Sequence, residues 1–76
     1  MDDMSTNKFN PEKLKLSKWT AVKPNKKEKH WLVTNIVRDE NLLIVGCKIE
    51  AIITKREIEL DFKELADQQQ WLQGWK

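Results

Sequence analysis

The chain has 76 residues, of which 34% are charged and 39% hydrophobic, and its formal net charge at pH 7 is +2. This length and balance are typical of one small soluble domain with a modest core, and they exclude a deep catalytic cleft between two lobes. No apolar run approaches the roughly 20 residues of a membrane-spanning helix, and the N-terminus lacks the apolar segment of a secretory signal. A single cysteine, Cys47, excludes an internal disulfide and a cysteine-based metal cluster. We therefore expect a cytoplasmic protein without cofactors.

Positive charge is concentrated in the first part of the chain. Residues 1–30 hold eight lysines against four acidic residues, whereas residues 31–76 hold six basic residues against eight acidic ones. Such an asymmetry affects solubility and association more than fold. It is interpreted either as a solvated surface or as a basic part that meets an acidic partner.

Residues 1–9 are polar and aperiodic, which predicts a disordered tail before a single domain at residues 10–76. Pro11 suits the start of one helical turn capped by Asn10. Residues 17–22 favour a strand, and the sequence KPNK that follows them favours a turn.

A second strand is predicted at residues 30–38. Alternation places Trp31, Val33 and Val37 on one face of this strand, with Leu32 and Ile36 on the other.

The polar sequence DEN at residues 39–41 predicts a tight connection in which Asn41 takes a left-handed backbone. Folding the chain there places Trp31 near Ile49 and Val33 near Cys47.

The longest run of strand chemistry is residues 42–62, LLIVGCKIEAIITKREIELDF. Polar and apolar side chains alternate on both sides of Lys55 and Arg56, which predicts a hairpin with these two residues as its loop. A longer loop is the alternative, because Lys-Arg lacks the glycine or asparagine of tight hairpins. Gly46, inside the first strand of the hairpin, predicts a bulge or bend. The register pairs Ile53 with Ile58, Ala51 with Leu60 and Ile49 with Phe62.

After Phe62 the periodicity becomes helical, and Asp61 and Glu64 have the spacing of a capping box. We expect a short helix or a pair of turns at residues 63–70. Trp71 and Trp75 are four residues apart and would share one side of a helical turn, which Gly74 would end in the left-handed region.

These elements predict a mainly β domain. About four antiparallel strands form a meander curled into a small SH3-like half-barrel, and a short C-terminal helix or turn closes one end. An OB-like barrel ranks second, because it usually needs five strands and a longer chain.

Four sequence runs carry a family resemblance: SKWTAV at residues 17–22, EKH at 28–30, TKRE at 54–57 and WLQGWK at 71–76. In this order they resemble the small tryptophan-rich bacterial proteins of uncharacterised function, over roughly residues 10–76. In that family an aromatic residue, often Phe, stands at the position of Trp31, and Trp often stands at that of Phe62. The resemblance implies a soluble, single-domain bacterial protein and implies no activity.

Tryptophans at positions 19, 31, 71 and 75 are the most unusual feature of the composition. A small domain can use such large side chains in its core, and we assign at least three of them to it. In the functional alternative, Trp19 and Trp75 stay partly exposed, as anchors for a protein partner or as platforms for stacked bases.

Two further candidate partner-binding sites are basic. The first is a lysine-rich segment between Trp19 and Trp31, where charges could hold phosphates beside aromatic rings. The second is Arg56, whose guanidinium can bind a carboxylate or phosphate through two hydrogen bonds. For both, the alternative is a solvated loop with local ion pairs. The lysines of the segment are Lys23, Lys26, Lys27 and Lys29.

No catalytic or metal site is predicted. His30 is expected to be a packed strand residue and Cys47 a small buried side chain, while the acidic residues at positions 57, 59 and 61 follow one solvated strand face. We expect a non-enzymatic binding module with no membrane contact, monomeric, with an edge-strand dimer as the alternative.

A protein partner ranks first and single-stranded nucleic acid second, because a net charge of +2 is weak for a nucleic-acid protein. An exposed tryptophan that shares a surface with the lysines would favour nucleic acid, whereas an apolar patch elsewhere would favour a protein.

Overall fold

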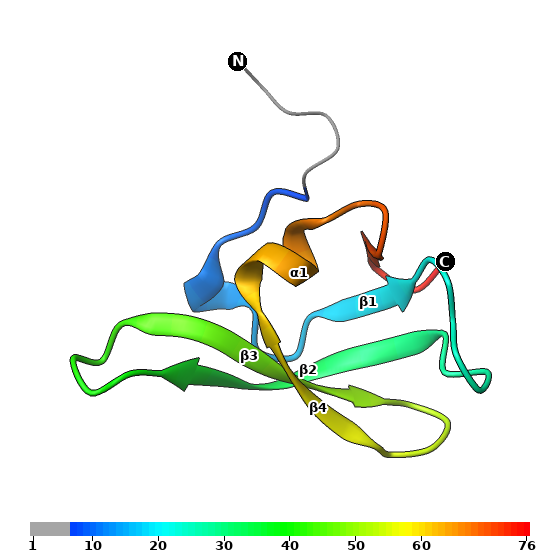
Figure 1. The fold of residues 1–76 in the computed structure, drawn as a ribbon, viewed down its shortest axis with the longest axis horizontal. Coiled ribbons are helices and arrows are strands. Elements are labelled where there is room, and N and C mark those ends of the chain that lie inside the picture. The colour runs from blue at the N-terminus through cyan, green and yellow to red at the C-terminus, as the bar shows by residue number, and fades with distance from the viewer. Residues whose placement is uncertain (1–6) are drawn as a thin grey trace.

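The computed structural model describes residues 7–76, and residues 1–6 lie outside the described part. Five antiparallel strands form one sheet, with one short α-helix between the last two strands (Figure 1). No helix within residues 7–76 has the length and apolar character to cross a membrane. The elements are η1 (Pro11–Lys13, a 3-10 helix), β1 (Lys18–Ala21), β2 (His30–Arg38), β3 (Ile44–Ala51), β4 (Glu57–Asp61), α1 (Phe62–Ala66) and β5 (Trp71–Gln73).

The strand order is β4-β3-β2-β1-β5. Strands β1 to β4 form the predicted four-stranded meander, and β5 returns across the sheet to pair with the other edge of β1, so that Ala21 lies opposite Trp71. The prediction of a mainly β, antiparallel domain with a short helix near the C-terminus is confirmed, but the prediction of a helical turn at residues 71–75 is wrong. Residues 71–73 are a fifth strand because the open edge of β1 offers backbone partners that a helical turn would leave unpaired.

The predicted single helical turn at Pro11 is confirmed. Its cap is Asn10, whose side-chain oxygen accepts a hydrogen bond from the backbone N–H of Glu12 at 3.0 Å. The predicted helix at residues 63–70 is shorter than expected and ends at Ala66. The side chain of Asp61 caps it by accepting from the backbone N–H of Lys63 at 2.9 Å.

Strand β2 has the predicted bounds, but one face differs from the prediction. Register shifts lie between Val33 and Asn35 and between Val37 and Arg38, so one strand carries an extra residue at each of these places. Because such a bulge reverses the alternation beyond it, Ile36 packs against the core instead of Val37.

Both predicted hairpin registers are wrong by an even number of residues. Ile58 lies opposite Ile49 instead of Ile53, because residues 52–55 form a longer turn in which Lys55 N–H donates to Ala51 O at 2.8 Å. Trp31 likewise lies opposite Ala51 instead of Ile49. An even shift keeps the same side chains on each face, so the inner face was correctly identified except for Ile53, which lies in the longer turn and is 66% exposed.

Three predictions, for Asn41, Gly46 and Gly74, can be compared with the backbone. The left-handed residue of the β2–β3 turn is Leu42, with φ of 63°, instead of Asn41. Gly46 lies next to a register shift, as predicted, and its backbone lies against β4: a Cβ there would stand 2.4 Å from Leu60 O. Gly74 has the predicted positive φ, of 81°, but it follows a strand.

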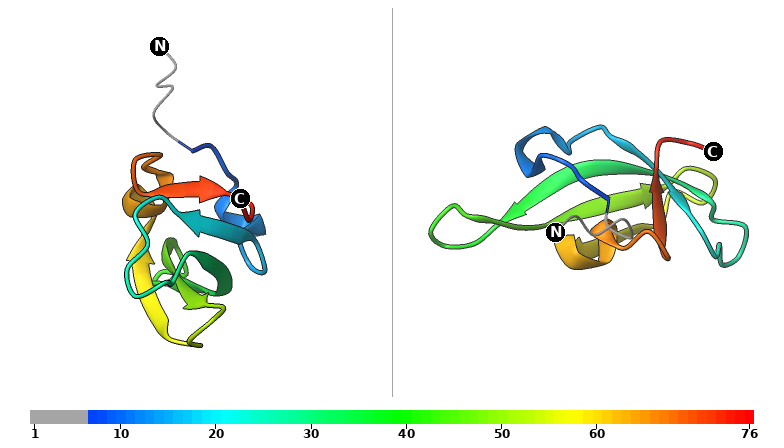
Figure 2. Two further views of the ribbon diagram at one scale, coloured as in Figure 1. Left: turned by 90° about the vertical axis from the view of Figure 1, so that its right-hand side faces the viewer. Right: turned by 90° about the horizontal axis from the view of Figure 1, so that it is seen from above.

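The core lies between the inner face of the curled sheet and a cover made by the N-terminal segment and α1, which lie on the same side of the strands (Figures 1 and 2). Trp31 and Trp71 meet edge to face there, with ring centroids 5.7 Å apart. Leu65 of α1 is completely buried. The buried apolar residues are Leu14, Trp19, Trp31, Val33, Cys47, Ile49, Ala51, Leu60, Leu65 and Trp71.

The N-terminal segment joins the domain earlier than predicted. Asn7 is buried, and its side-chain amide donates to Trp71 O at 2.8 Å and to Leu65 O at 3.1 Å. Phe9 packs against Trp19 with ring centroids 5.6 Å apart. Residues 7–9 of the predicted tail are therefore part of the domain, and residues 1–6 lie outside the described residues.

A candidate anion-binding end of the sheet

Two loops meet at one end of the sheet. The β1–β2 loop (residues 22–29) and the β3–β4 loop (residues 52–56) both project from the end where the C-terminus lies (Figures 1 and 2). The loops are joined by Glu28, whose side chain has only 2% of its surface exposed. Lys29 O accepts from Ala21 N–H at 2.8 Å, which returns the first loop to the sheet directly after Glu28.

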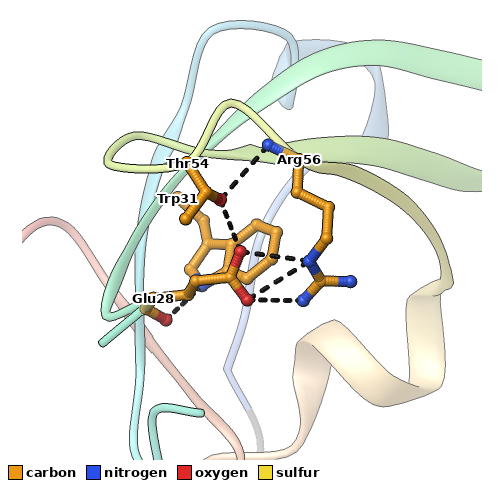
Figure 3. Close-up of polar contacts among 4 residues, drawn as sticks. All are labelled: Glu28, Trp31, Thr54 and Arg56. Atoms are coloured by element: carbon orange, nitrogen blue, oxygen red, sulfur yellow. Dashed lines mark hydrogen bonds and ion pairs between the residues drawn. The ribbon is translucent and has the colours of Figure 1, made fainter. Parts of the chain in front are cut away.

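Two side chains, those of Arg56 and Thr54, donate hydrogen bonds to the carboxylate of Glu28 (Figure 3). Arg56 donates from Nε at 3.0 and 3.2 Å and from Nη2 at 2.6 Å, and the hydroxyl of Thr54 donates at 2.5 Å. The backbone carbonyl of Glu28 accepts from the indole N–H of Trp31 at 2.8 Å. The guanidinium of Arg56 also lies 5.6 Å from the Trp31 ring centroid. The pair is therefore both hydrogen-bonded and packed on an aromatic ring, as a buried carboxylate requires.

These contacts keep Glu28 ionised. Hydrogen bonds from Arg56 and Thr54 lower the pKa of Glu28 from 4.5 to about 2, against the opposing effect of burial. The same hydrogen bond with Glu28 raises the pKa of Arg56. The charge of Glu28 is thus balanced mainly by Arg56, whose side chain is 52% exposed, and Lys26 also interacts with it electrostatically.

The charged side chains that the two loops expose are all basic. Together they hold six basic residues and one acid, Glu28, which is turned inward. We call the exposed lysines of the two loops the basic end. They are Lys23, Lys26, Lys27, Lys29 and Lys55.

Three of the five lysines have an unfavourable backbone conformation. Lys26, Lys27 and Lys55 have φ of 54°, 65° and 65°. Glu28 N–H donates to Asn25 O at 2.9 Å across a turn whose two central residues are Lys26 and Lys27. Turns of this kind strongly favour asparagine and glycine, so lysine at both positions has a conformational cost. Strain retained in this way is typical of positions that serve a function.

An exposed aromatic ring stands beside the basic end. Trp75 is 43% exposed, and its indole N–H donates to Trp31 O at 2.9 Å. Its ring centroid lies 5.9 Å from that of His30, the residue after Lys29, and 4.8 Å from Nζ of Lys18. The prediction that Trp75 is partly exposed is confirmed.

The other predicted site residues are placed differently. Trp19 is 1% exposed and donates its indole N–H to the hydroxyl of Ser17 at 2.9 Å, so the prediction that it stays exposed is wrong. It lies in the core, where its ring packs edge to face against Phe9. Arg56 is at the basic end, but its guanidinium is bound to Glu28, and its first role is to join the two loops.

Sequence reasoning missed this ion pair, although its members lie in two of the runs that carry the family resemblance. Glu28 belongs to EKH, while Thr54 and Arg56 belong to TKRE. Glu28 and Arg56 are 28 positions apart in the sequence, so only the tertiary structure brings them into contact. The sequence did offer one indication of this ion pair, because each of the two runs places a charged residue in or beside a predicted loop.

Metal-ligating and nucleophilic side chains are the remaining groups to place. Within residues 7–76, no three His, Cys, Asp or Glu side chains converge in a group that could hold a metal ion. Burial raises the pKa of the Cys47 thiol to about 11, and the side chain is completely buried, as predicted. A thiol in this state is a poor nucleophile.

Comparison with protein families gives a match to one family model, described as tryptophan-rich protein (DUF2389), over residues 17–76. The match spans all five strands, α1 and both loops of the basic end. Comparisons with curated proteins and with solved structures gave no match.

Proposed function

This chain belongs to the tryptophan-rich protein family, and from that premise we propose that it is a non-enzymatic module that binds single-stranded nucleic acid at its basic end. The observation that carries the proposal is the inward position of Glu28. Because Arg56 binds this buried carboxylate, the two loops present five lysines and no exposed acidic side chain. The exposed charges of the two loops therefore attract a polyanion, and the nearest exposed carboxylate in the sequence is that of Glu57, directly after the second loop.

The exposed ring of Trp75 favours single-stranded nucleic acid over a duplex as the ligand. An indole ring that is 43% exposed can stack on an unpaired base, and every base has a face on which to stack. The ring is fixed by the hydrogen bond from its N–H to Trp31 O, and Lys18 lies over it. In this mechanism the lysines hold phosphates and Trp75 holds a base, so binding depends little on sequence.

The test is a fluorescence titration with a ten-residue oligothymidylate at several salt concentrations. We expect saturable quenching. If all five lysines contact phosphates, the logarithm of the binding constant falls with the logarithm of the salt concentration with a slope of about −3.5, at roughly 0.7 per phosphate on a single strand. A flat titration at low salt would refute the proposal.

Variants that remove lysine charges test whether the strand binds at the basic end. Replacing Lys23, Lys26 and Lys27 by Gln is expected to reduce the slope to about −1.4, because two of the five contacts remain. The matched control replaces Lys15, Lys48 and Lys63 by Gln, which removes the same charge elsewhere and should keep most of the slope. Equal losses in both variants would mean that net charge alone attracts the strand. Trp75→Leu should weaken binding by roughly 5- to 150-fold.

A protein partner is the second candidate, favoured by an apolar patch at the tip of the β2–β3 hairpin. Leu42, Leu43 and Val45 are 73%, 63% and 46% exposed there. Isolated apolar residues on a surface are normal, but three near one projecting turn suit a docking contact. A photocrosslinking residue at position 43 should then capture one discrete partner in cells, while the same residue at position 59 on β4 should not.

We further propose that the curled sheet is an SH3-like half-barrel and that the protein works in the cytoplasm. Two observations support this: the sheet is a strongly curled antiparallel meander with a fifth strand, and its one cysteine is a buried free thiol. Cell fractionation tests the location, and an experimental structure tests the barrel geometry.

A further inference from the structure

A groove of about 450 Å³ lies at the opposite side of β1 from β2, between the N-terminal segment and the end of β5. Phe9, Leu14 and Trp19 contribute apolar surface to it. Leu14 and Trp19 are only 2% and 1% exposed and lie beneath the groove, so the apolar surface open to a ligand comes mainly from Phe9 and Leu16. The volume lies in the range of small-molecule sites, and an apolar lining with few polar groups is typical of them.

Leu16 borders this groove in an unusual state. Its backbone is left-handed, with φ of 70°, and 66% of the residue is exposed. The conformation is fixed by hydrogen bonds from Leu16 N–H to Val33 O at 2.8 Å and from Ser17 N–H to Leu14 O at 2.9 Å. Glycine would meet the same backbone requirement without strain, so the leucine side chain is retained for something other than the turn.

The charge around the groove has one sign. Lys13 and Lys18 line it and no acidic residue does. Both lysines are exposed, but the ammonium group of Lys18 lies over the ring of Trp75, which does not line the groove, so Lys13 is the lysine offered to a ligand at the rim. A ligand with an apolar body and one negative end would match this distribution, whereas a cationic or neutral ligand would leave Lys13 without a counterpart.

We infer that the groove binds an aliphatic monocarboxylate of medium chain length. The chain lies along Phe9 and Leu16, above the buried Leu14 and Trp19, and the carboxylate lies at the rim where Lys13 stands. This site is separate from the basic end and does not depend on it: its floor comes from the N-terminal segment and β1, and its anion needs no aromatic stacking.

The test is an NMR titration of the isotope-labelled protein with decanoate, decanol and decyltrimethylammonium, each below its micelle concentration. We expect saturable shifts of the Leu14 and Leu16 methyl groups and of the Trp19 indole. Decanoate should bind about tenfold more tightly than decanol, since one charge-assisted contact is worth about one decade of affinity, and the cation should not bind. Equal binding of all three probes, or no shift with decanoate, would overturn the inference.

Glycine substitution offers a matched pair of variants. Leu16→Gly and Leu42→Gly each remove an exposed leucine with positive φ, of 70° and 63°, and each relieves the same kind of strain. Both variants should melt at or above the temperature of the parent protein. Only Leu16→Gly should weaken decanoate binding, by about fivefold or more, as expected for removal of a buried aliphatic contact. Equal losses in both would assign the shifts to general apolar adsorption and refute the site.

The variant Lys13→Gln distinguishes the contribution of the lysine charge to ligand binding from that of the apolar groove. It should weaken decanoate binding and leave decanol binding unchanged. Replacing Lys26 and Lys27 by Gln should change neither, so failure of this site is distinguishable from failure of the nucleic-acid proposal. Loss of decanol binding in Lys13→Gln would show instead that the variant has lost the shape of the groove.

Discussion

Glu28 is the residue on which both loops of the basic end depend, and its titration makes the dependence measurable. Its pKa is lowered from 4.5 to about 2 in the folded protein. A carboxyl whose folded pKa is depressed adds stability above the unfolded pKa and loses it as the pH falls through the folded value. We therefore expect the free energy of unfolding to decline as the pH is lowered from about 4.5 towards 2.

The measurement is urea denaturation at a series of pH values. Glu28→Gln should lower the stability at pH 7, because Arg56 and Thr54 lose their charged partner, and should flatten the decline below pH 4.5. Glu59→Gln, which changes an exposed residue of β4, should keep the parental pH profile. A parental profile in Glu28→Gln would mean that other carboxyl groups cause the acid sensitivity.

Gly46 is required for close contact between strands, whereas Gly74 is required only for its backbone angle. Gly46→Ala places a Cβ 2.4 Å from the Leu60 carbonyl oxygen, and because that neighbour is backbone we expect a loss of roughly 3 kcal/mol, at the upper end for overpacking. Gly74→Ala meets no atom within 4 Å and should cost about 1 kcal/mol for the positive φ. Thermal melts of both variants check this order, and the reverse order would contradict it.

At the scale of elements, the β1–β2 turn is stable despite its sequence. Lys26 and Lys27 both have positive φ, so Lys26→Asn with Lys27→Gly should raise the free energy of unfolding by roughly 1–2 kcal/mol. The same double variant should weaken oligothymidylate binding. Replacing both lysines by Gln removes the same charges and keeps the strain, so it should weaken binding without the gain in stability. A denaturant titration separates the two effects.

The sequence predicts a helix or strand well when the residues that determine it are close together in the chain. Strand β2 and the turn at Pro11 were predicted with their bounds because alternation and capping are local. The register of β3 and β4 was not, since it depends on a turn in which Lys55 takes a left-handed backbone without glycine. Strand β5 was mistaken for a helical turn, because residues 71–73 become a strand only through pairing with β1.

The candidate site was predicted in part for the same reason. The lysines of the first loop and the exposure of Trp75 follow from composition and position in the chain. The role of Arg56 and the burial of Trp19 do not, since they depend on Glu28 and on Phe9, whose positions are set by tertiary packing.

At the scale of the whole molecule, Asn7 connects three separate parts of the fold. Its backbone N–H donates to Ala66 O at 2.6 Å, and its side chain reaches Leu65 O and Trp71 O. Asn7→Ala would leave two buried carbonyl groups without this donor and should cost about 2 kcal/mol. Asn41→Ala, at the exposed tip of the β2–β3 hairpin, should be close to neutral. Equal stability of both variants would show that the side-chain hydrogen bonds of Asn7 do not stabilise the domain.

The position of β5 next to β1 also constrains the order in which the domain can fold. Strands β1 to β4 each pair with a neighbour in the chain, so this meander can form before residues 71–73 are in place. Trp31 then still lacks Trp71, and β1 still lacks the hydrogen bond from Gly74 N–H to Lys18 O. Because pairing across more than fifty residues is the slower step, we expect the final strand to set the rate of folding. The indoles that stabilise the finished core are therefore also the surface that each newly made chain exposes longest.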